Sequence, residues 1–220
     1  DAPYSERVVF DALKERLPKE VIVMHSKRYF FEATGRRPPR QGECDFIILD
    51  PPRGVLDIEV KGGRIRRDAS GNWTSTNREG EHSIGDPGKQ AEKNIRAITK
   101  LLSRHPMMRG LSEFRFGWCT CFPDSQVRGD LGPDLPRSLA IGHGDLPDLR
   151  NAIESAFAAH GADGREPCAV TRKVFLDTLA PELDLAPTLA SRLDDDLPVL
   201  VRLTGEQLGI LEQMKRMPRL

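Results

Sequence analysis

The chain of 220 residues lacks any apolar run approaching the roughly 18 residues that a membrane-spanning helix needs. Its first residues also lack the charged and then apolar layout of a secretory signal peptide. The four cysteines are too few, and too irregularly spaced, for a disulfide scaffold. We therefore predict a soluble, cytoplasmic protein in a reducing compartment, with no membrane partner.

The sequence also lacks net charge, because 33 Lys and Arg residues balance 33 Asp and Glu residues. The distribution is uneven: Lys and Arg outnumber Asp and Glu by 21 to 16 through Arg109, and are outnumbered by 17 to 12 after it. A basic N-terminal half permits a nucleic-acid partner, since Lys and Arg supply phosphate contacts. Many neutral enzymes have a similar local excess, so the asymmetry alone does not select a function.

With 38% hydrophobic residues and no internal repeat, the chain can bury one substantial core and a small appendage. Residues 5–17 predict a helix that Pro18 ends, with an apolar stripe of Val9, Phe10, Leu13 and Leu17. Asp86 caps a second helix, which Pro87 begins and which continues to about Leu102. No helix or strand is predicted for the polar, Gly-rich residues 62–85. The other predicted elements are a strand at 114–122, helices at 145–160, 170–179 and 203–214, and a linker at 181–202.

Two strand-like runs, residues 44–49 and 55–61, flank a turn rich in Pro and Gly and predict a β-hairpin. Alternation along the second strand puts Leu56, Ile58 and Val60 on one face, and Val55, Asp57, Glu59 and Lys61 on the other. If the strands pair symmetrically about the turn, with Leu49 opposite Val55, Asp45 lies opposite Glu59 with Cβ atoms about 5 Å apart. A slip of one residue would move Asp45 to the other face.

Directly opposed carboxylates destabilise a sheet unless a cation compensates them, and Lys61 or a divalent metal would do so. The set of Asp45, Glu59 and Lys61 suits phosphodiester hydrolysis. Hard carboxylate oxygens hold Mg²⁺ (or Mn²⁺), which polarises a phosphoryl group and lowers the pKa of a bound water, and the lysine orients that water. An ordinary solvated strand face gives the same Glu59-Val-Lys61 pattern with no catalytic role, and this alternative stays open.

Two further polar side chains fall on apolar helical stripes. Glu6 shares the stripe of Val9 in the first helix, where a charged group facing the core needs a reason. Gln90 shares a stripe with Asn94 and Ile98 in the later helix and is expected to reach inward. The alternatives are a first-turn glutamate that favours the helix dipole and an exposed amide.

Five short motifs, in order, resemble the nuclease-related domain family, NERD, over roughly residues 5 to 125. They are Ser5-Glu6, Gly42-Glu-Cys-Asp45, Ile58-Glu-Val-Lys-Gly62, Gly71-Asn-Trp73 and Asp86-Pro-Gly-Lys-Gln90. One departure is Asp86, where the family usually has Asn; Asp also caps helices.

The resemblance implies membership of the PD-(D/E)xK nuclease superfamily, with a restriction-endonuclease-like core. It implies that Asp45 and Glu59 are metal ligands, that Lys61 is the catalytic lysine, and that Glu6 and Gln90 are supporting active-site residues.

The C-terminal segment resembles the entry to a superfamily-one helicase motor, through Leu203-Thr-Gly-Glu-Gln207 and Arg216-Met-Pro-Arg-Leu220. In that family the glutamine recognises adenine. No phosphate-binding G-x-x-x-x-G-K-[ST] loop occurs in this sequence, so the chain alone is not expected to hydrolyse ATP. The resemblance implies the N-terminal piece of a nuclease-helicase, whereas a capping box would explain Thr204 and Gln207 equally well.

Together these observations predict an α/β fold with a central mixed sheet flanked by helices and a helical C-terminal extension. The expected divisions are a nuclease core at 1–125, its helical continuation at 126–180, and a linker with the start of a motor at 181–220. The predicted function is Mg²⁺-dependent cleavage of DNA, in repair or in defence against foreign DNA. The alternatives are a catalytically inactive nucleic-acid-binding module and a docking scaffold for the motor.

Overall fold

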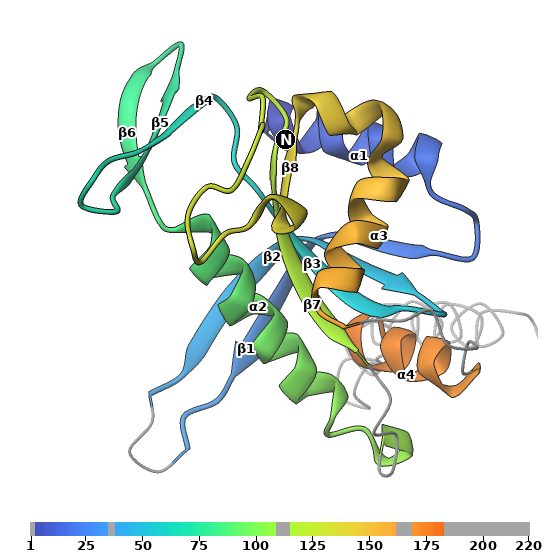
Figure 1. Ribbon diagram of the computed structural model, residues 1–220. Coiled ribbons are helices and arrows are strands. Elements are labelled where there is room, and N and C mark those ends of the chain that lie inside the picture. Colours follow the sequence, from blue (N-terminus) through green and yellow to red (C-terminus); the bar gives the residue numbers. More distant parts are fainter. Residues whose placement is uncertain (1–2, 35–37, 109–114, 162–168, 183–220) are drawn as a thin grey trace, which may run out of the picture. The chain divides into compact units, whose positions relative to one another are not determined.

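The structure, a computed structural model, describes residues 3–34, 38–108, 115–161 and 169–182 (Figure 1). Its helices are α1 (Tyr4–Arg16), α2 (Pro87–Leu102), α3 (Leu149–Ala159) and α4 (Ala169–Leu179), with 3-10 turns at Pro106–Met108, Arg137–Leu139 and His143–Asp148. Its strands are β1 (Ile22–Phe31), β2 (Arg40–Asp50), β3 (Gly54–Val60), β4 (Arg64–Arg67), β5 (Trp73–Asn77), β6 (Gly80–Ile84), β7 (Phe116–Phe122) and β8 (Ala140–Gly142).

The centre of the fold is a five-stranded sheet in the order β1-β2-β3-β7-β8. Strands β1, β2 and β3 are antiparallel neighbours, whereas β3, β7 and β8 run parallel. Because parallel neighbours need a crossover, the chain between β3 and β7 leaves the sheet and returns through α2. The predicted mixed sheet with flanking helices is confirmed.

Helices cover both faces of this sheet, and each face has its own apolar core. On one face α1 and α3 pack against β2, β3 and β7 through Val9, Leu13, Ile153, Phe157, Phe46, Ile58 and Cys121. On the other face α2 and α4 pack through Ile95, Ile98, Phe175, Ile47, Leu49 and Val55. Strand β3 is buried along its whole length, which is typical of a central strand covered on both sides.

The β2–β3 hairpin has the predicted register, with Leu49 opposite Val55. Gly54 closes the turn with φ +116, and a Cβ there would lie 2.2 Å from the carbonyl oxygen of Arg115. A side chain cannot fit at this position, so the glycine sets the hairpin against the start of β7. The predicted division of β3 into two faces is also confirmed, since Leu56 and Val55 belong to opposite cores.

The β1–β2 ladder is interrupted at Ser26 and Asp45. Ser26 has φ +50, which is uncommon for a residue other than glycine. In β2, Phe46 belongs to the α1 face, whereas Cys44, which strict alternation would put on the same face, belongs to the α2 face. Alternation therefore breaks at Asp45. The regular pairing of β2 with β3 also stops at Phe46, so Asp45 lies just beyond the ladder rather than opposite Glu59 within it.

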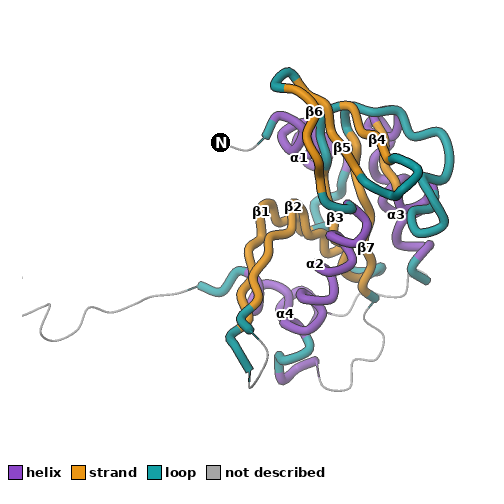
Figure 2. Tube along the Cα trace, turned by 90° about the vertical axis from the view of Figure 1, so that its left-hand side faces the viewer, coloured by secondary structure: helices purple, strands orange, loops and turns teal. Residues whose placement is uncertain are grey.

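Several elements were not predicted. Strand β1 lies in a segment that received no assignment, and β8 adds a parallel strand to residues 126–180, which were expected to be helical. The polar residues 62–85 form an antiparallel three-stranded sheet, β4-β5-β6, which we call the arm. Figure 2 shows the arm extending away from the five-stranded sheet. Its strands carry mostly polar side chains, so they lack the apolar alternation by which strands are recognised.

The predicted stripe of the first helix is wrong at one position, because Phe10 is 43% exposed while Val9 and Leu13 are buried. The described residues through Pro181 belong to one compact unit. The predicted helix at 203–214, the motor-like motif, and all but the first two residues of the predicted linker at 181–202 lie outside the described residues. No helix in the described ranges is both long enough and apolar enough to span a bilayer.

Candidate active site

The end of β3 carries a buried ion pair. Glu59 has no solvent exposure, and Lys61, two residues later on the same face, donates a hydrogen bond to its Oε1. The Lys61 side chain is 19% exposed and reaches the surface of a cleft. Asp45 lies beside the pair and lines the same cleft, where its Oδ2 accepts a hydrogen bond of 2.7 Å from the Val60 amide. The structure thus brings these two carboxylates and the lysine together at the end of β3, the central strand of the sheet.

Burial controls the charge of both carboxyl groups. Burial, together with the nearby charge of Asp45, raises the pKa of Glu59 to about 7, although Lys61 acts in the opposite direction. Burial also raises the pKa of Asp45, although the hydrogen bond from Val60 and the charge of Lys61 oppose the change. Two carboxylates therefore share a partly desolvated site with one cation. A second cation placed between them would relieve their repulsion.

Asn94 in α2 supports Glu59 from the opposite side. Its Nδ2 lies 3.3 Å from Glu59 Oε2 and 2.9 Å from the Glu43 carbonyl oxygen, and its Oδ1 accepts a hydrogen bond of 3.0 Å from the Tyr29 hydroxyl. Gln90, one turn earlier, is only partly buried, and within the described ranges no hydrogen bond joins its side chain to the carboxylates. The asparagine on the apolar stripe is thus the α2 residue that touches the pair.

Asp57 is a third carboxyl group on this face of β3. It is fully buried, and neither of its oxygens has a hydrogen-bond partner of normal geometry. Burial raises the pKa of Asp57 well above its ordinary value, the Cys44 thiol lowers it, and the charges of Glu59 and Asp45 raise it. The net upward shift of the pKa favours the neutral form of Asp57. Strand alternation puts it beside Glu59, which is the signal by which the sequence could have identified it.

Glu6 in α1 lies at the edge of the site. Its Oε2 is 2.7 Å from Nε2 of His25, and the His25 ring packs on Phe46 with centroids 4.8 Å apart. The negative charge of Glu6 raises the pKa of both Asp45 and Glu59, so it lies close enough to act on them electrostatically. His25 was missed because strand β1 was not predicted.

The cleft, of about 1130 Å³, lies between the start of α1, the end of β3 and the arm. One wall of the cleft carries Glu6, Asp45 and Lys61. The other wall belongs to the arm and carries Asn77, Arg78, Glu79 and His82. Glu59 lies beneath the first of these walls. The cleft thus has two carboxylates and a lysine on one wall, and Arg78, Glu79 and His82 on the other.

Two glycines after Lys61 fix the end of β3 against both walls. A Cβ on Gly62 would lie 2.7 Å from Ser5 in α1, so the close approach of helix and strand needs glycine here. Gly63 has φ +82, and its amide donates to Asp124 Oδ2 at 2.8 Å. Ser75 of the arm donates to the Gly62 carbonyl at 2.7 Å. These contacts restrain the backbone that carries Lys61.

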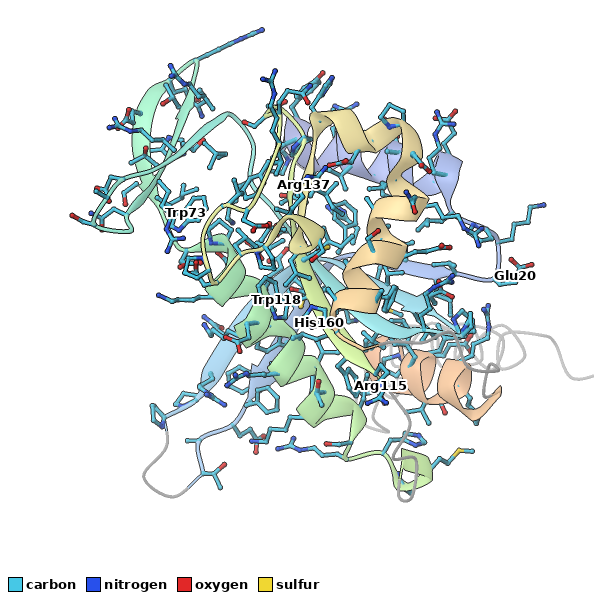
Figure 3. The ribbon with its side chains drawn as sticks, in the orientation of Figure 1. Glu20, Trp73, Arg115, Trp118, Arg137 and His160 are labelled. Carbon is cyan, nitrogen blue, oxygen red and sulfur yellow. The ribbon has the colours of Figure 1, made fainter. Side chains whose placement is uncertain are left out.

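The base of the arm is packed onto the main sheet. Trp73, labelled in Figure 3, is buried and stacks on Phe122 of β7 with centroids 6.3 Å apart and rings within 9° of parallel. The guanidinium of Arg67 lies over the Trp73 ring, 5.3 Å from its centroid, and donates two hydrogen bonds of 2.8 and 3.0 Å to Asp134. Arg67 is therefore held by Trp73 and Asp134 and is not available to bind a phosphate group.

Asp45 and Glu59 are the carboxylates of this site that could hold a divalent metal ion. In the part of the chain that the structure describes, no three His, Cys, Asp or Glu side chains gather as a metal cage. Ca²⁺ and structural Zn²⁺ use more protein ligands than this, whereas Mg²⁺ is commonly held by one or two carboxylates together with water and substrate phosphates. Asp45 and Glu59 provide such a pair, with mutual repulsion that a cation would reduce.

Comparison with known proteins gives one finding. The chain matches the family model of the nuclease-related domain, NERD, over residues 4–119. The matched region includes α1, the β2–β3 hairpin, the arm, α2 and most of β7. No curated protein matches the chain. No solved structure matches it either.

Proposed function

Because the chain belongs to the nuclease-related domain family, we propose that it is a metal-dependent nuclease that hydrolyses phosphodiester bonds of DNA. One observation carries the proposal: a buried glutamate paired with a lysine, beside a second carboxylate, at the surface of an open cleft. Buried charged groups cost stability through desolvation, and a site with perturbed pKa values in a cleft is typical of catalysis. We assign this site to the PD-(D/E)xK type.

Asp45 and Glu59 would hold Mg²⁺ or Mn²⁺ through their carboxylate oxygens. When bound, the ion would polarise the scissile phosphoryl group and lower the pKa of a coordinated water. The protein's part is to keep both carboxylates available in one place. Asn94 fixes Glu59 from the α2 side, and the Val60 amide fixes Asp45 from β3.

Lys61 is the group that would act on the reacting atoms. Its ammonium lies at the cleft surface, held there by Glu59, and would orient the attacking water and offset negative charge on the phosphoryl oxygens. Glu6, on the same wall of the cleft, would help to position that water. Gln90 keeps the supporting role that the family resemblance implies, in the same helix as Asn94.

The test is cleavage of plasmid and single-stranded DNA by the chain with Mg²⁺ or Mn²⁺, beside a reaction with EDTA. Lys61→Ala and Glu59→Ala should each abolish cleavage while circular dichroism shows an intact fold. Lys14→Ala is the matched control, since it removes an exposed lysine of α1 that is remote from the cleft lining. It should cleave as the wild type does.

Undiminished cleavage by Lys61→Ala would refute the assignment of this centre. If the chain binds DNA but does not cleave it with either Mg²⁺ or Mn²⁺, the result would instead favour the alternative of an inactive nucleic-acid-binding module. Association with a motor domain, but with neither DNA nor metal, would favour a docking scaffold. The proposed nuclease-helicase context concerns residues 203–220, beyond the described part of the chain, and stays a prediction.

A further inference from the structure

A strip of cations runs along the outer side of α2, away from the candidate active site. Its α2 members are Lys89, Lys93, Arg96 and Lys100, spaced at i, i+4, i+7 and i+11. Arg40 of β2 lines a surface groove together with these four residues, and Arg104 lies just beyond the end of the helix. At 3.6 residues per turn, the four helical positions fall within roughly 60° of arc and span about 17 Å. We call these six residues the basic strip.

The basic strip is far from electrically neutral. Two acidic side chains oppose its six cations: Glu92, which lines the same groove, pairs with Arg96, and Asp86 at the start of the helix pairs with Lys89 at 3.6 Å. Lys89 and Lys93 are an i,i+4 pair of like charge, and so are Arg96 and Lys100, an arrangement that destabilises a helix. Opposite charges at this spacing stabilise a surface helix, and α2 has one such pair, Glu92 with Arg96. The pattern indicates a polyanionic partner that relieves the repulsion.

The strip borders a shallow groove of about 390 Å³ whose floor includes Tyr29, Phe31 and Ala97. Two of its cations are held in place by this floor, since Lys100 Nζ lies 5.0 Å and the Arg104 guanidinium 5.2 Å from the centroid of the Phe31 ring. Ordering the long side chains in advance reduces the entropy lost on binding. The phenylalanine therefore serves as a platform for the cations.

We propose that the basic strip binds the phosphate backbone of DNA outside the cleft and guides the DNA into the cleft. The choice of DNA rests on the proposed function. A row of charges about 17 Å long exceeds what one phosphate group needs, and a duplex presents one negative charge per roughly 1.7 Å of its axis.

Helix α2 connects the strip to the active site in two ways. Its inward side carries Asn94, which contacts Glu59, while its outward side carries the strip. The helix also begins just after β6 (Figure 1), whose Ile84 lines the cleft, and Lys89 is the strip residue closest in sequence to that end of the helix.

The test compares a Lys93→Gln/Lys100→Gln variant with wild type for binding of short fluorescent DNA in EDTA, where a metal-dependent nuclease does not cut. Duplex and single strand are separate arms, each measured over a series of NaCl concentrations. Loss of two phosphate contacts should weaken binding about tenfold at moderate salt and flatten the slope of log affinity against log salt by about 1.8 for duplex or 1.4 for single strand. The matched control is Lys14→Gln/Lys19→Gln, which removes two exposed lysines at and after the end of α1.

In cleavage assays with Mg²⁺ the strip variant should have a raised KM and an unchanged kcat, because the strip binds ground state and transition state alike. An unchanged salt slope, or a loss equal to that of the Lys14→Gln/Lys19→Gln control, would overturn the proposal. Wild type that binds DNA through the strip but never cleaves would contradict the nuclease function and leave the strip standing. Cleavage by the strip variant with an unaltered KM would support the nuclease function and contradict the proposed role of the strip.

Discussion

Replacing Glu59 by glutamine should remove a pH-dependent loss of stability that the wild-type protein has in the absence of metal. Glutamine has the shape of a protonated glutamate but cannot ionise. The pKa of Glu59 is raised by burial to about 7, from an ordinary value of 4.5. The folded state therefore keeps a proton on Glu59 over a pH range in which the unfolded chain has released it.

The sign of the effect follows from this difference. Because the folded-state pKa is the higher one, the contribution of protonated Glu59 to stability is fully present below pH 4.5 and is lost as pH rises through about 7. Each unit of pKa corresponds to about 1.4 kcal/mol, so the loss attributable to this group is about 3 kcal/mol. Glu59→Gln should match wild type at the acid end and exceed it in stability above neutral pH.

The measurement is the free energy of unfolding from urea titrations in EDTA at a series of pH values. Glu15→Gln, at an exposed position of α1, is the control, since it removes a carboxylate from the surface. Added Mg²⁺ should restore stability to wild type above neutral pH and leave Glu59→Gln unaffected, because the metal binds the deprotonated carboxylate. Parallel curves for wild type and Glu59→Gln across the pH range would refute the reasoning.

Three further substitutions test the fold around the site. Leu13→Ala, at a buried position of α1, should lower the free energy of unfolding by about 2–5 kcal/mol in urea titrations, and a loss below 1 kcal/mol would contradict the packing of α1. Asp86→Ala removes the acceptor of the Lys89 amide at the start of α2 and should cost about 1 kcal/mol by thermal melting, whereas Asp86→Ser should recover most of it. Gly63→Ala combines φ +82 with a Cβ 2.7 Å from the Ser75 hydroxyl, so it should destabilise by more than about 1 kcal/mol and reduce cleavage; unaltered stability would show that this turn relaxes.

Local patterns predicted the elements that carry their own signals. The helix at 5–17, the β2–β3 hairpin with its register, and the Asp86 cap of α2 each depend on residues close together in the sequence. The cap is present as predicted, with Asp86 Oδ1 accepting from the Lys89 amide at 3.0 Å. Strand β1 could have been predicted too, because Ile22-Val-Met and Tyr29-Phe-Phe31 are typical strand residues.

The arm and strand β8 were harder to predict. Strands β5 and β6 consist largely of Thr, Ser, Asn, Glu and His, and a short polar sheet has no apolar alternation. The arm is stabilised by long-range contacts, among them Trp73 on Phe122 and Arg67 with Asp134, between residues that no local pattern connects. Strand β8 is three residues long and forms only because β7 offers it a free parallel edge.

By itself the sequence determined the β2–β3 register and, through strand alternation, put Glu59 and Lys61 on one face, because these features depend on neighbours within a few residues. Only the tertiary structure decided the position of Asp45, since the β1–β2 ladder is interrupted at Ser26 and Asp45, and the side-chain alternation of β2 breaks there. It also decided that Asn94 contacts Glu59 and that Glu59 is completely buried. Burial sets the charge of the site, and burial depends on packing between segments distant in the sequence.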